Sequence, residues 1–96
     1  MFLTITTSKV NAKQAPMVEA FLKEFLPKFS KFPGVVAIYH YTEAEKKSES
    51  TVVIWESEEA IKAYWASDLI REPIAFEKAN NLASTREKHR LVFKLP

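Results

Sequence analysis

The chain has 96 residues, of which 47% are hydrophobic and 27% charged, with a formal net charge of +2 at pH 7 and no cysteine. This length predicts one domain over residues 1–96, which buries only about 60–65% of its unfolded surface. The even charge balance disfavours nucleic acid and anionic membranes as partners, and the lack of cysteine excludes disulfides and thiolate chemistry. We therefore expect a globular protein that binds neither nucleic acid nor membrane.

The first ten residues, MFLTITTSKV, lack the basic leader, long apolar run and small-residue cleavage site of a signal peptide. No window of the sequence approaches the ~18 consecutive apolar residues of a membrane-spanning helix. A cytoplasmic location is therefore the expectation.

The first part of the chain predicts a strand and a long amphipathic helix. The β-branched segment 2–8, FLTITTS, is typical of a strand. In residues 15–29, APMVEAFLKEFLPKF, apolar side chains recur at helical spacing, and Pro16 suits the first turn. The sequence FPG at 32–34 ends this helix, and Gly34, the only glycine, suits a positive φ angle.

The second part predicts a hairpin, two helical pieces and a closing strand. Strands are expected at 35–42 (VVAIYHYT) and 51–56 (TVVIWE), with a solvated loop at 43–50 (EAEKKSES) between them. Ser57 is a candidate N-cap for a helix whose buried stripe would comprise Ala60, Ile61, Tyr64 and Trp65. A further helical piece starts near residues 67–68, and HRLVFKL at 89–95 predicts the last strand.

The resulting order, βαββαβ, predicts a ferredoxin-like α+β fold with a four-stranded antiparallel sheet and helices on one face. Both faces of the sheet are apolar in sequence. In the strand at 35–42, one face would carry Val35, Ala37, Tyr39 and Tyr41, and the other Val36, Ile38 and His40. One chain has helices for only one face, so we expect a homodimer through the open sheet face.

The residues PGV at 33–35 and the pattern V-x-x-W-E-S-E-E-A at 52–60 resemble the antibiotic biosynthesis monooxygenase (ABM-like) superfamily. Its members are ferredoxin-like dimers that form an α+β barrel, so the resemblance implies this dimeric fold and oxidation of a small molecule. Residues 55–74, WESEEAIKAYWASDLIREPI, are most similar to the haem-degrading branch of the superfamily.

The functional residues of that branch do not carry over to this chain. Its haem-distorting tryptophan falls on Tyr64, its iron-ligating histidine falls on Ile74, and its first-strand asparagine has no counterpart in residues 2–8. Because isoleucine cannot ligate iron, we expect no haem degradation and no cofactor.

Five side chains are candidates for the site. His40 could deprotonate a phenolic substrate, although the sequence reveals no partner for it, and a structural or interface imidazole is the alternative. Tyr64 could orient a substrate oxygen, and Trp55 and Trp65 could line the walls, with core packing as the alternative for all three. Arg71 could neutralise an anionic substrate or form a surface ion pair.

The sequence gives little support to a metal site, a charged binding face or RNA recognition. No histidines and carboxylates have metal-ligand spacing, so no metal site is expected. The charged run REKHR at 86–90 is typical of a solvated face. RNA-recognition modules share the βαββαβ order, but STVVIWES at 50–57 lacks the glycine and basic residues of their base-stacking motif.

Two functions remain open. One is cofactor-independent oxidation of a small aromatic or quinol-type substrate, with His40 as the base. The other is a non-catalytic dimeric module that binds a ligand or serves a structural role. A cavity of roughly several hundred Å³ with convergent polar groups would favour the enzyme, and one plugged by Trp55, Trp65 and Phe93 would favour the inert module.

Overall fold

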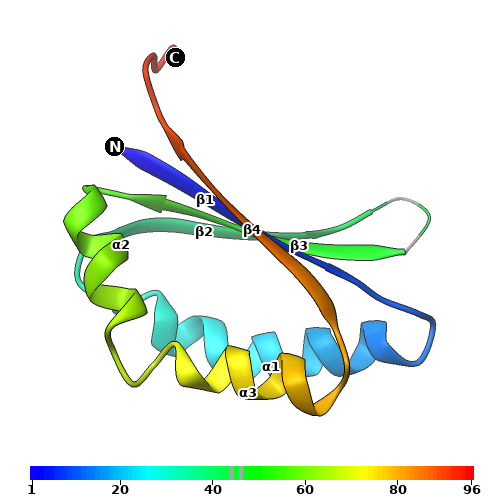
Figure 1. The fold of residues 1–96 in the computed structure, drawn as a ribbon. Coiled ribbons are helices and arrows are strands. Elements are labelled where there is room, and N and C mark those ends of the chain that lie inside the picture. Colours follow the sequence, from blue (N-terminus) through cyan, green and yellow to red (C-terminus); the bar gives the residue numbers. More distant parts are fainter. Residues whose placement is uncertain (44, 46) are drawn as a thin grey trace.

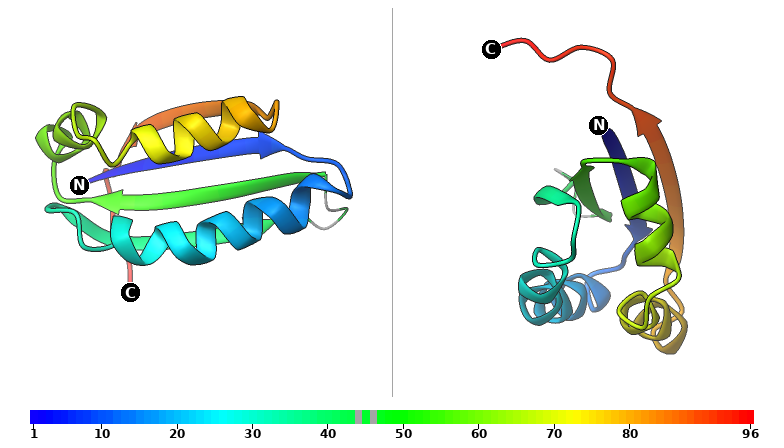
Figure 2. Two further views of the ribbon diagram at one scale, coloured as in Figure 1. Left: turned by 90° about the horizontal axis from the view of Figure 1, so that it is seen from below. Right: turned by 90° about the vertical axis from the view of Figure 1, so that its left-hand side faces the viewer.

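The computed structural model, which describes residues 1–43, 45 and 47–96, forms a four-stranded antiparallel sheet with helices on one face (Figure 1). In chain order the elements are β1 (Phe2–Lys9), α1 (Gln14–Phe29), β2 (Val35–Thr42), β3 (Ser48–Trp55), α2 (Glu58–Trp65), α3 (Arg71–Ala79) and β4 (Ala83–Arg90). The strand order is β2-β3-β1-β4. Figure 2 shows α1 and α3 side by side beneath the sheet, with α2 at one end. The predicted ferredoxin-like fold is confirmed.

The closing strand predicted at 89–95 is wrong. The polar segment Ala83–Arg90 forms β4 instead, and it pairs with β1 from Lys9 opposite Ala83 to Phe2 opposite Arg90. An edge strand needs backbone pairing on one side only, so a polar sequence can fill it. Residues 91–96 have no regular structure and extend away from the helices (Figure 1), with exposed side chains at Leu91, Val92, Phe93 and Leu95.

The third strand also differs from its prediction. β3 starts at Ser48 rather than Thr51, because its ladder with β1 continues until Ser48 lies opposite Lys9. Glu49 and Ser50, which were predicted to lie in a solvated loop, are therefore buried strand residues. Of that predicted loop, residues 44 and 46 lie outside the described residues.

A bulge changes the predicted faces of β2. The register with β3 shifts between Val35 and Ala37, so the alternation of side chains is interrupted at Val36. Val35 and Ile38 consequently both pack against the core between the sheet and the helices. Val36 lies exposed with Tyr39 and Tyr41, so the predicted grouping of Val36 with Ile38, and of Val35 with the tyrosines, is wrong.

Two local predictions are confirmed close to the start of α2. Gly34 has a φ of 94°, and its carbonyl accepts a hydrogen bond of 2.8 Å from the Glu56 amide. The Ser57 hydroxyl accepts a 3.2 Å hydrogen bond from the Ala60 amide, which makes it the N-cap of α2. These contacts fix where α2 leaves the sheet, and so where its inner face lies.

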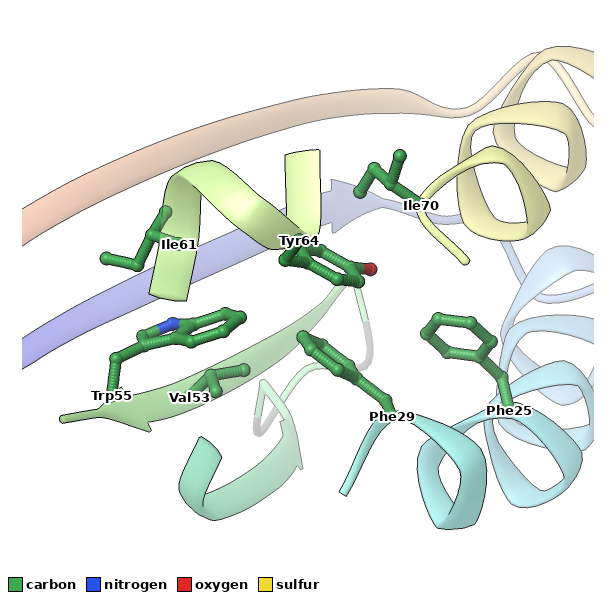
Figure 3. Packing of buried hydrophobic residues seen from close by; sticks show 7 residues of the cluster. All are labelled: Phe25, Phe29, Val53, Trp55, Ile61, Tyr64 and Ile70. Carbon is green, nitrogen blue, oxygen red and sulfur yellow. The ribbon is translucent and has the colours of Figure 1, made fainter. Parts of the chain in front are cut away.

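The core is concentrated at one end of the layer between sheet and helices. Its buried members are Phe25, Phe29, Val53, Trp55, Ile61, Tyr64 and Ile70 (Figure 3). The rings of Phe29 and Tyr64 stack with centroids 4.4 Å apart and an interplanar angle of 11°. Such a pair contributes about 0.5–1.5 kcal/mol to stability in addition to the effect of burying its apolar area.

Among the described residues, no helix combines the length and hydrophobicity needed to cross a membrane.

Candidate functional site

A cavity of about 380 Å³ lies between the inner face of the sheet and the three helices. Its floor is formed by side chains of all four strands, and its walls by α1, α2 and α3. Phe93 does not plug it, because that side chain lies exposed in the C-terminal segment. The volume is within the range of small-molecule sites.

The strand register arranges polar side chains of the inner sheet face in two neighbouring rows. One row crosses the sheet through His40, Thr51, Thr6 and Arg86, and the next through Thr42, Glu49, Ser8 and Ser84. Towards the other end of β3, Val53 and Trp55 make the floor apolar. The cavity therefore has a polar end and an apolar, aromatic end.

His40 and Glu49 form a buried acid–base pair at the polar end. The His40 Nε2 atom lies 2.7 Å from Glu49 Oε1, and the Glu49 side chain is only 1% exposed. The Thr42 hydroxyl donates a short hydrogen bond to the second carboxylate oxygen. On the other side of the imidazole, Nδ1 lies 3.0 Å from Thr51 Oγ1. His40 thus has a carboxylate and a hydroxyl partner, which the sequence analysis did not identify.

Tyr64 projects from α2 into the space between the helices. Its ring is buried, and Figure 3 shows its hydroxyl directed between Phe25 and Ile70. Within the described residues, none of the hydrogen bonds involves this hydroxyl, which is not wholly buried. Burial raises the pKa of the Tyr64 phenol well above its ordinary value. The hydroxyl is therefore a neutral hydrogen-bond donor that a bound ligand can reach.

The two tryptophans lie in different surroundings. Trp55 is 1% exposed, and its indole Nε1 donates a 2.8 Å hydrogen bond to Thr4 Oγ1, so it is both a core residue and part of the cavity floor. Trp65 lines the cavity but is 48% exposed, so its predicted burial in the stripe of α2 is wrong. One residue along a helix turns by about 100°, which carries Trp65 off the face of Ile61 and Tyr64.

The cations that line the cavity include Arg86, Lys62 and Lys88 but not Arg71. Arg71 is absent from the cavity lining, and its exposed guanidinium lies 3.5 Å from the Asp68 carboxylate. Arg86 lines the cavity from β4, with guanidinium nitrogens 3.1 and 2.5 Å from the two carboxylate oxygens of Glu77. Its guanidinium also lies 5.4 Å from the centroid of the Trp65 ring. The sequence analysis interpreted the run REKHR as a solvated face. For this reason it did not identify the inward side chain of Arg86.

Two of these site residues had signals in the sequence. Glu49 follows the inward alternation of Thr51, Val53 and Trp55, so a strand extended to residue 48 would have placed it beside His40. In β4, the side chains of Arg86 and Glu87 are expected to point to opposite faces of the sheet. Which of the two points towards the helices depends on the register with β1, which the sequence does not reveal.

No protein-family model matches the sequence, and no curated protein matches it. Solved structures do match over almost the whole chain. A protein from Deinococcus radiodurans described as an antibiotic biosynthesis monooxygenase has a TM-score of 0.90 and 12% identity, covering 100% of this chain and 97% of that one. SnoaB, a cofactor-independent oxygenase from Streptomyces nogalater, has a TM-score of 0.81 and 16% identity, covering 99% and 96%.

A third structure, the NE2512 protein of unknown function from Nitrosomonas europaea, has a TM-score of 0.76 and 18% identity, covering 99% of this chain and 93% of that one. The chain therefore has the fold of the antibiotic biosynthesis monooxygenase superfamily, as its resemblance implied.

Proposed function

We propose that this protein is a small-molecule monooxygenase that oxidises an electron-rich aromatic or quinol-type substrate without a cofactor. The observation that carries the proposal is the buried His40–Glu49 pair at the polar end of an aromatic-walled cavity. The fold shared with a cofactor-independent oxygenase supports the same class of reaction.

The two ends of the cavity favour one orientation of such a substrate. Its ring would lie against Val53 and Trp55, and its reacting hydroxyl would point to the row that contains His40 and Thr51. Tyr64 would donate a hydrogen bond to a second substrate oxygen, and Trp65 would close the wall. Ring stacking and water exclusion both favour a flat aromatic molecule in this space. Arg71 has no part in this arrangement, because its guanidinium lies in solvent beside Asp68.

The reaction balances without a further reductant. His40 accepts the phenolic proton, and the resulting anion, which carries negative charge on a ring carbon, transfers electrons to dioxygen to form a carbon–oxygen bond. The peroxide takes up a proton. Loss of the C–H proton from the same carbon then breaks the O–O bond, so one oxygen atom remains as a quinone carbonyl and the other leaves as water. Glu49 would stabilise the imidazolium while the anion exists.

Oxygen uptake and quinone formation with a panel of hydroquinones and naphthols, with no added metal or flavin, test the proposal. His40→Gln is expected to lower kcat by about 100-fold, since a positioned general base contributes about 10²–10⁴. His89→Gln is the matched control, because His89 is an exposed histidine beside Glu87, and it should retain wild-type turnover. Unchanged turnover in His40→Gln would remove the assigned role.

A non-catalytic ligand-binding module is the second candidate, favoured by the apolar and aromatic share of the cavity lining. Such a module would bind the same hydroquinones and naphthols without consuming oxygen. Calorimetric binding combined with an oxygen electrode therefore separates the two functions.

We also propose a homodimer through the open sheet face. On this face β2 presents Val36, Tyr39 and Tyr41, all at least half exposed, and Tyr39 is 63% exposed. Leu3 and Ile5 alternate with the inward-facing Thr4 and Thr6 of β1, so they face the same way. An apolar sheet face of this extent is typical of a surface covered by a partner.

A further inference from the structure

The hydrogen bonds of His40 determine which ring nitrogen can act as a base. Its Nε2 atom faces Glu49, and its Nδ1 atom faces Thr51. An ionised carboxylate only accepts hydrogen bonds, so Nε2 carries the imidazole proton and donates it to Glu49. The basic lone pair is therefore on Nδ1, where it accepts a hydrogen bond from the Thr51 hydroxyl.

This arrangement places a hydroxyl that lines the cavity against the basic nitrogen of His40. Thr51 lines the cavity floor from the middle of β3, and its Oγ1 lies 3.0 Å from the basic nitrogen. Its single proton is used in the bond to His40, so its remaining hydrogen-bonding capacity towards the cavity is as an acceptor. A substrate hydroxyl that reaches this end of the cavity therefore meets an oxygen that can only accept.

We infer that Thr51 is a proton relay between the substrate hydroxyl and the His40–Glu49 pair. The substrate proton passes to Thr51 Oγ1 while the Thr51 proton passes to His40 Nδ1. The products are a substrate anion, a neutral Thr51 hydroxyl and an imidazolium held against the Glu49 carboxylate. This inference rests on the proposed function for its substrate class, but the proton transfer itself needs no oxygen.

The relay also defines which ligands the site accepts. A phenol or enol can donate its hydroxyl proton to Thr51, whereas a methyl ether of the same molecule cannot. The ether would leave the Thr51 lone pairs unpartnered, which should weaken its binding by about 5- to 150-fold relative to the free hydroxyl compound. The ligand class is thus a flat aromatic molecule with at least one acidic hydroxyl.

Para-nitrophenol tests the relay independently of oxygen chemistry, because its ionised form absorbs visible light. The fraction ionised in the bound state is measured at a pH where the free probe is mostly neutral. Wild-type protein and Thr51→Ser, which keeps the hydroxyl, should bind the ionised form. Thr51→Val, which replaces the hydroxyl with a methyl group of similar size, should lower the ratio of ionised to neutral probe at least ~10-fold.

His40→Gln should cause the same loss as Thr51→Val, and thermal unfolding establishes that each variant is folded. Equal ionisation of the bound probe in Thr51→Val and wild type would overturn the relay, as would a wild type that binds only neutral probe. Ionisation that follows the expected pattern without oxygen uptake from any hydroquinone would retain the relay and reject the oxygenase. Oxygen uptake that survives in Thr51→Val but not in His40→Gln would retain the oxygenase and reject the relay.

Discussion

At the scale of single residues, the site depends on one buried carboxylate. Removing one partner of a buried ion pair lowers the free energy of unfolding by about 3–5 kcal/mol. A buried glutamate therefore needs hydrogen-bond donors for its carboxylate oxygens. Here His40 and Thr42 each donate to one oxygen of Glu49. The same contacts hold the imidazole in one tautomer, and so give its two nitrogens different roles.

Tyr64 gives a prediction about alkaline stability. Burial raises the pKa of its phenol, with a smaller opposing effect from Arg86, so the folded state holds this proton more tightly than the unfolded state does. The unfolded state therefore ionises first, and the stabilisation is present below about pH 10 and lost as pH rises above it. Urea unfolding should show a steeper loss of stability between about pH 9 and 11 in wild type than in Tyr64→Phe. Parallel pH profiles for the two proteins would contradict this account.

At the scale of elements, the connection between α1 and β2 fixes how closely α2 approaches the sheet. Gly34 has a positive φ, and a Cβ built at this position would lie 2.3 Å from the Ala60 Cβ. The α2 helix therefore starts in contact with the backbone of the preceding crossover. This close approach places Ile61 and Tyr64 within the core.

Gly34→Ala is expected to destabilise the fold by about 2–5 kcal/mol, since the left-handed conformation costs about 1–2 kcal/mol and overpacking about 1–3 kcal/mol. The double variant Gly34→Ala with Ala60→Gly removes the clash but keeps the conformational cost. In urea unfolding, a double-mutant cycle should therefore give a favourable coupling of about 1 kcal/mol or more. Additive effects of the two substitutions would show that the clash does not limit the position of α2.

At the scale of the whole molecule, the helices cover only one face of the sheet, as Figures 1 and 2 show. The uncovered face carries apolar side chains from three strands, β1, β2 and β3. The segment 91–96, with its exposed apolar side chains Leu91, Val92, Phe93 and Leu95, extends beyond the sheet. A stable interface buries about 1,200–2,000 Å² in total, and in the proposed dimer a second copy would cover this face with the same apolar side chains.

Analytical ultracentrifugation at micromolar concentration should therefore detect a dimer. The double variant Val36→Lys with Tyr39→Lys should sediment as a monomer, because lysines would be buried against a second copy, and both side chains are already exposed in the single chain. Ala20→Lys with Ala63→Lys adds the same charge at exposed helical positions and should remain dimeric. A monomeric wild type would exclude the interface.

The order of the elements could be predicted from the sequence, because it depends on local signals. Apolar spacing in residues 15–29, the single glycine at 34 and the cap at Ser57 each act within a few residues of the chain. The class of fold follows from that order, and the structural comparisons confirm it. Four of the five candidate side chains, His40, Tyr64, Trp55 and Trp65, were also found from local chemistry and line the cavity.

The partners of those side chains were decided only by the tertiary structure. Glu49 meets His40 because β3 includes residue 49 and pairs with β2 in the register that places Thr42 opposite Glu49. Arg86 turns inward because β4 pairs with β1 in the register that places Thr6 opposite Arg86. The bulge in β2 exchanges the faces of Val35 and Val36 relative to the rest of the strand. Strand register depends on backbone pairing between segments far apart in sequence, and a shift of one residue exchanges the two faces. Sequence by itself determined which residues bear the chemistry, and the sheet decided which of them meet.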